Sequence, residues 1–69
     1  MEKEKIVNLL KQVELAIESD IETCKTEIKK AEDGSNSTAQ SLYIGKKAGL
    51  ELALSYVSIV LIDTIKGEY

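Results

Sequence analysis

The sequence predicts an all-α fold: a two-helix antiparallel hairpin that dimerises into a four-helix bundle. Three observations predict it. The chain contains no proline, its apolar residues recur with the 3.6-residue period of a helix, and one short polar cluster separates its two halves. Because 69 residues can hold only one small core, we expect residues 1–69 to form a single domain.

The first helix is predicted over residues 2–32. Its apolar positions are spaced by three or four residues, which is typical of a helix and not of a strand. These positions are Ile6, Leu10, Val13, Ile17, Ile21, Cys24, Ile28 and Ala31. At 100° per residue the apolar stripe is only about 80° wide, so a single neighbouring helix can cover it.

The polar residues 33–37 are predicted to form the turn between the helices. Gly34 suits the left-handed conformation that commonly follows the end of a helix. Ser37 and Gln40 match a capping box, so the second helix is expected over residues 38–66, ending at Gly67. Two helices of similar length joined by a short turn pack antiparallel.

The second helix is apolar around most of its circumference, and its polar stripe is only about 80° wide. Its apolar residues fall into two groups. Sector A contains Gly45, Gly49, Leu52, Tyr56 and Ile59. Sector B contains Tyr43, Leu50, Leu54, Val57 and Leu61.

A single hairpin would leave one of these two sectors in water. Exposure of five such side chains forfeits roughly 1.5 to 3 kcal/mol each, which in sum is comparable with the stability of a small domain. We therefore expect a homodimer or a higher oligomer, in which the second helices pack together and the first helices lie outside. Sector B is predicted to be the oligomer interface.

Small residues occupy every fourth position at the start of the second helix, namely Ser41, Gly45, Gly49 and Ala53. Such spacing is typical of close helix packing. The preferred interpretation is a tight crossing of the two helices inside the hairpin. The alternatives are a close contact between protomers and a slot that receives side chains of another protein.

The residue types exclude most catalytic centres. The chain has no histidine or arginine, and its one cysteine, Cys24, lies on the apolar stripe of the first helix and is predicted to be a core residue. We therefore expect no catalytic, cofactor-binding or metal-binding residue, and no enzymatic activity. The net charge of −3 has the wrong sign for binding nucleic acid.

The most apolar stretch, residues 48–62, contains Glu51 and is shorter than the roughly 20 apolar residues that a membrane span needs. We interpret it as a buried helix and expect no membrane partner. Because the first residues are charged and lack the apolar region of a secretory signal, and the single cysteine cannot form an internal disulfide, a cytoplasmic location is predicted.

Glu14, Glu18 and Glu22 form an acidic stripe along one flank of the first helix. Carboxylate metal sites in helical bundles also use histidine, which this chain lacks. The stripe is therefore either a solvated face or a partner-binding surface. If the second helix is buried by self-association, we expect a partner protein to bind this acidic stripe.

The leading functional hypothesis is a small regulatory protein that binds and modulates a larger protein. Eight isoleucines and the absence of arginine are typical of proteins from AT-rich genomes, such as those of low-GC bacteria and their phages. The more specific form of this hypothesis is a phage-encoded inhibitor of a host or defence enzyme. The hairpin outline is similar to the small two-helix phosphatases of sporulation response regulators. However, residues 37–42 lack that family's Ser-Gln-Glu-Leu-Asp run, so no site is carried over. A purely structural oligomer and an accessory to a phosphotransfer protein are the alternatives.

Overall fold

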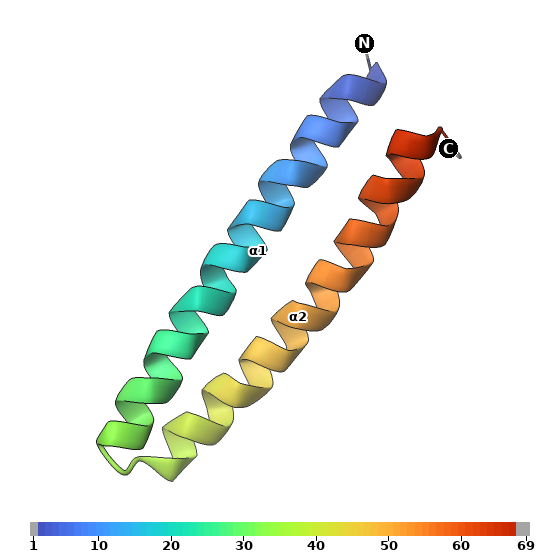
Figure 1. The fold of residues 1–69 in the computed structure, drawn as a ribbon. Coiled ribbons are helices and arrows are strands. Elements are labelled where there is room, and N and C mark those ends of the chain that lie inside the picture. Colours follow the sequence, from blue (N-terminus) through green and yellow to red (C-terminus); the bar gives the residue numbers. More distant parts are fainter. Residues whose placement is uncertain (1, 68–69) are drawn as a thin grey trace.

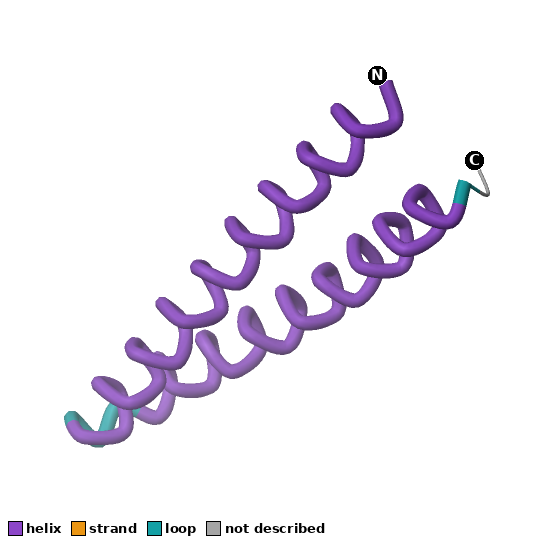
Figure 2. The backbone as a smooth tube through the Cα atoms, turned by 45° about the horizontal axis from the view of Figure 1, so that its top comes forward, coloured by secondary structure: helices purple, strands orange, loops and turns teal. Residues whose placement is uncertain are grey.

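The computed structural model describes residues 2–67 and shows a two-helix hairpin. Helix α1 (Glu2–Asp33) and helix α2 (Ser37–Lys66) lie side by side and run in opposite directions (Figure 1). A short loop joins them at one end, and the start of α1 and the end of α2 lie at the other end of the hairpin (Figure 2). The Cα atoms extend over 51 × 15 × 11 Å. The predicted all-α hairpin is confirmed, and both helices have the predicted bounds to within one residue.

Helix α1 carries charges that suit its dipole. Glu2 and Glu4 lie in its first turn, and Lys30 lies in its last turn. Two ion pairs along the helix surface, Lys25–Glu22 at 3.1 Å and Lys30–Glu27 at 3.7 Å, are exposed to solvent. Such surface pairs add at most about 1 kcal/mol each, so the stability of α1 depends mainly on its apolar contacts with α2.

The turn corrects the prediction for Gly34. The left-handed residue is Ser35, with φ 55°, one position later than expected. Two hydrogen bonds hold it there, from Ser35 N to Glu32 O at 3.1 Å and from Asn36 N to Ala31 O at 2.8 Å. This is the Schellman pattern of helix ends. Because α1 continues through Asp33, the left-handed position falls on a serine.

The start of α2 also differs from the predicted capping box. Asn36, not Ser37, is the N-cap, and its side-chain oxygen accepts a hydrogen bond from Ala39 N at 3.1 Å. Asparagine is among the strongest N-cap residues, so it takes this position from the serine that follows it. At the other end Gly67 is left-handed, with φ 77°, and ends the helix as predicted.

The core of the hairpin is thin. Its buried residues are Ile21, Cys24 and Ala31 of α1 with Leu61 and Thr64 of α2. Cys24 is only 1% exposed, which confirms its prediction as a core residue. The buried hydroxyl of Thr64 donates to Val60 O at 2.8 Å and so needs no partner from α1.

Candidate interaction surfaces

Sector B of α2 faces α1. Leu61 is buried, and the other four members, Tyr43, Leu50, Leu54 and Val57, are half-buried. In this two-helix structure α1 covers sector B. The residues predicted to form the interface between protomers therefore form the interface within the hairpin. The sequence defines two apolar sectors but not which of them α1 covers, because a helical pattern does not give the rotation of one helix relative to the other.

Sector A of α2 points to solvent instead. Leu52, Tyr56 and Ile59 are 56%, 61% and 56% exposed. Further exposed apolar residues flank this sector and widen it into one continuous surface, which we name the outer face. The outer face comprises Leu42, Ile44, Gly45, Ala48, Gly49, Leu52, Tyr56, Ile59, Val60 and Ile62.

As expected for a single hairpin, one apolar sector of α2 stays in water, so residues 48–62 are not a buried helix in one copy of the chain. Of the twelve large apolar residues that are exposed within residues 2–67, eight belong to α2. By length and composition alone, α2 could cross a membrane, and only 6% of its most apolar window is buried in the hairpin. The expectation of no membrane partner therefore remains a prediction.

The small residues of α2 do not form a tight crossing with α1. A methyl group added at Gly45 or Gly49 would meet no atom within 4 Å beyond the backbone of its own helix. Ser41 is exposed, and Ala53 is half-buried. The preferred interpretation, close packing inside the hairpin, is therefore wrong. A contact between protomers and a slot for another protein remain predictions.

The acidic stripe of α1 is only partly free. Glu14 is half-buried and accepts a hydrogen bond from Ser58 Oγ of α2 at 2.8 Å. Glu22 pairs with Lys25 of its own helix, although its side chain stays 71% exposed. Glu18 is exposed. Glu18 and Glu22 are thus the members of this stripe best placed to meet a partner.

An open groove of about 500 Å³ lies between the helices on this acidic side. Ile21 and Leu54 contribute apolar lining, and the carboxylates of Glu18, Glu22 and Glu51 contribute acidic lining. Glu22 pairs with Lys25 at 3.1 Å and Glu51 with Lys47 at 3.5 Å. The sequence reasoning missed Glu51 as a neighbour of the stripe. The sequence places Glu51 on the polar side of the second helix. That position predicts a place beside the acidic stripe only once the rotation of α2 is known.

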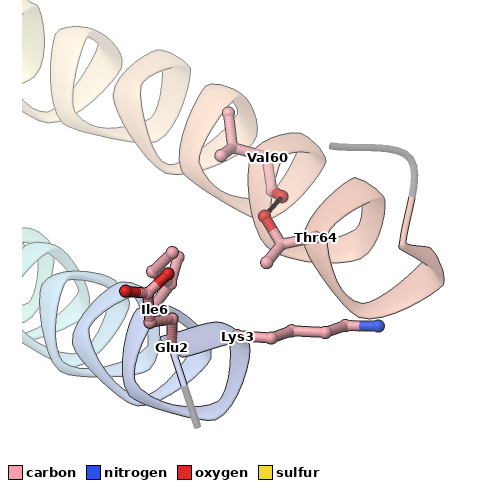
Figure 3. Close-up of a pocket in the computed structure, with 5 residues that line it drawn as sticks. All are labelled: Glu2, Lys3, Ile6, Val60 and Thr64. Carbon is pink, nitrogen blue, oxygen red and sulfur yellow. Dashed lines mark hydrogen bonds between the residues drawn. The ribbon is translucent and has the colours of Figure 1, made fainter.

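A second groove of about 500 Å³ opens where the free ends of the helices meet (Figure 3). It is lined by Glu2, Lys3 and Ile6 of α1 and by Val60 and Thr64 of α2. The Thr64 hydroxyl is already bonded to its own helix, which leaves one carboxylate and one ammonium group beside apolar side chains. This arrangement lacks an acid, base and nucleophile in mutual contact, so it suggests no reaction.

No group of three or more cysteine, aspartate or glutamate side chains within residues 2–67 could hold a metal ion. No family model, curated protein or solved structure matches the chain. The surfaces described above are therefore the basis for a functional proposal.

Proposed function

We propose that this chain is a small, non-enzymatic interaction protein, a helical hairpin that self-associates through α2 and binds and modulates a larger protein. The observation that carries the proposal is the exposed outer face of α2. Monomeric proteins rarely leave a continuous apolar surface of this kind in water. Such surfaces are typical of protein interfaces.

The thin core of the hairpin supports self-association. Within residues 2–67 only four apolar residues are buried. A chain of this size rarely gains more than about 3 to 5 kcal/mol from its core, and oligomerisation is one common remedy. Burial of Leu52, Tyr56 and Ile59 would add roughly 1.5 to 3 kcal/mol for each side chain that becomes fully covered.

The acidic groove supports the second part of the proposal, binding of a larger protein. Its apolar lining suits the aliphatic stem of a lysine or arginine side chain, and its carboxylates suit the charged head. A basic surface on the partner therefore fits this side of the hairpin. Complementary charge also accelerates encounter, especially at low salt.

Affinity capture tests partner binding. The tagged chain would be exposed to a lysate of the cells in which it is made, and retained proteins would be identified at two salt concentrations. We expect a retained protein whose recovery falls with salt. Glu18→Gln with Glu22→Gln should abolish the recovery, whereas Glu2→Gln with Glu4→Gln, a matched change on the same helix, should not. Equal recovery with both double variants would contradict the role of the groove.

The identity of the retained protein separates the versions of the proposal. The isoleucine-rich, arginine-free composition supports a phage or low-GC bacterial origin, and therefore an inhibitor of a host or defence enzyme. Recovery of a phosphotransfer protein would favour the accessory role. Absence of any salt-sensitive partner would favour a purely structural oligomer.

Membrane association is a second candidate function, favoured by the length and apolar composition of α2. We prefer self-association because Lys47, Glu51 and Ser58 form a polar strip along the middle of the helix, and charged groups are costly in hydrocarbon. Flotation with neutral phosphatidylcholine vesicles tests this preference. The chain should stay with the unbound fraction, and quantitative flotation would favour the membrane instead.

A further inference from the structure

We infer that the outer face of α2 binds a second copy of this chain in the antiparallel orientation, with Leu52 of both copies at the two-fold axis. This inference rests on the proposed self-association and adds its orientation and register. The chain offers an exposed apolar face along a helix with no neighbour on that side. The order of side-chain sizes along that face indicates what covers it.

Along its centre line the outer face changes from small to large side chains. Within about 60° of Leu52, its first half exposes Gly45, Ala48 and Gly49, and its second half exposes Tyr56 and Ile59. The large residues Leu42 and Ile44 lie at the two edges of the face, about 80° from Leu52. The space beside both glycines is open in the hairpin. A partner helix could therefore approach the first half closely, while the second half presents bulky side chains that need room opposite them.

An antiparallel copy centred on Leu52 satisfies both requirements. Positions equally distant from residue 52 then face each other across the axis, so Gly45 lies opposite the partner's Ile59, and Ala48 lies opposite the partner's Tyr56. At the edge of the face the facing pairs are offset along the axis: Leu42 lies near the partner's Val60, because both lie about 80° to the same side of Leu52. Each large side chain thus meets a small or apolar one, and Leu52 meets its own copy.

The parallel orientation fits less well. It would place Gly45 against the partner's Gly45 and Tyr56 against the partner's Tyr56. The helix axes would be held apart by the tyrosines, and empty space would remain between the glycines. Because protein interfaces are packed about as densely as interiors, such space loses favourable contacts. Antiparallel helices also place opposite ends of their dipoles together.

The charge and extent of the outer face also suit a second copy. Lys46, Lys47 and Glu51 lie about 100° to 140° around the helix from Leu52 at 100° per residue, so they need not be buried. Asp63 lies in line with Leu52 but just beyond Ile62, at the end of the contact, where the partner's Ser41 lies opposite it. The face extends over about 30 Å of helix at 1.5 Å per residue, and half the accessible circumference of a helix is about 20 Å. The two copies would then bury at most about 1,200 Å² in total, at the lower end of the range of specific interfaces.

Disulfide trapping tests the register. In a Cys24→Ala background, Leu52→Cys places the two new sulfur atoms at the two-fold axis, within reach of a disulfide. Ala48→Cys, one turn earlier on the same face, places its two copies more than about 12 Å apart along the axis in the antiparallel dimer. Mild oxidation should therefore convert most of the Leu52→Cys protein, and little of the Ala48→Cys protein, into a covalent dimer on a non-reducing gel.

Efficient trapping of both variants would show a parallel dimer and overturn the inference. Trapping of neither, with a dimer seen by light scattering, would place the contact on another face and also overturn it, while self-association would stand. A monomeric wild-type chain would overturn both. Circular dichroism would establish that the variants remain helical.

A second pair of variants tests the same contact without cysteine. Gly45→Leu places a large side chain opposite the partner's Ile59 and should weaken dimerisation at least tenfold. Lys46→Leu makes the neighbouring position equally large but lies away from the outer face, so its dimer affinity should change less than threefold. Equal effects of the two variants would contradict the inferred register.

Discussion

The hydroxyl of Ser58 in α2 donates a hydrogen bond to Glu14 Oε2 in α1, 2.8 Å away across the hairpin. These residues are 44 positions apart in the sequence. Their contact brings the polar side of α2 against the acidic flank of α1. With α2 held at that rotation, sector B faces α1 and sector A faces solvent.

Ser58→Ala should lower the free energy of unfolding by about 1 kcal/mol, because the half-buried Glu14 carboxylate loses a donor. Urea denaturation at a fixed protein concentration measures the change. Ser55→Ala is the control, since Ser55 Oγ bonds only to the backbone oxygen of Glu51 in its own helix. A double-mutant cycle with Glu14→Ala, which removes the acceptor, isolates the pair. Zero coupling in this cycle would mean that the bond contributes nothing.

Ser35→Gly should stabilise the hairpin by about 0.5 to 1 kcal/mol, because glycine adopts the left-handed conformation without the strain of a side chain. A shift of the urea midpoint measures the gain. Gly34→Ala should be tolerated, since a methyl group there would lie 3.4 Å from Lys30 O and Gly34 does not have a positive φ. Strong destabilisation by Gly34→Ala would instead show that Gly34, and not Ser35, is the left-handed residue.

Asn36→Ala should destabilise the hairpin by about 1 kcal/mol, because the amide of Ala39 loses the side-chain acceptor that caps α2. Thermal unfolding followed by circular dichroism measures the loss. Ser37→Ala is the matched control and should change stability by only a few tenths of a kcal/mol, since Ser37 is already inside the helix. The reverse order of effects would favour the predicted capping box.

The helices were predictable from sequence because their periodic apolar residues and the single polar cluster all indicate the same hairpin. The two caps at the turn were each wrong by one residue, whereas Gly67 ends α2 as predicted. Gly34 and Ser35, and likewise Ser37 and Asn36, are neighbouring residues that can serve the same role. The choice between them depends on where α1 ends, which the backbone hydrogen bonds of Ser35 and Asn36 decide.

The interaction surfaces were less predictable than the fold. A helical wheel gives angles within one helix but not the rotation of one helix relative to the other. The sequence therefore separated Leu52 from Leu54 correctly as members of different sectors, but it assigned Leu54 to the protomer interface. In the structure Leu54 is half-buried on the side of α1, whereas Leu52 is exposed. Contacts between the two helices, such as that of Ser58 with Glu14, hold this rotation, and a helical wheel does not show them.

Self-association through the outer face of α2 is measured by multi-angle light scattering at low micromolar concentration. For a 7.6 kDa chain, we expect a helical species of at least twice that mass, and Leu52→Asp should return it to a helical monomer. A wild-type chain that is fully helical, cooperatively folded and 7.6 kDa in mass would show that the outer face does not cause self-association.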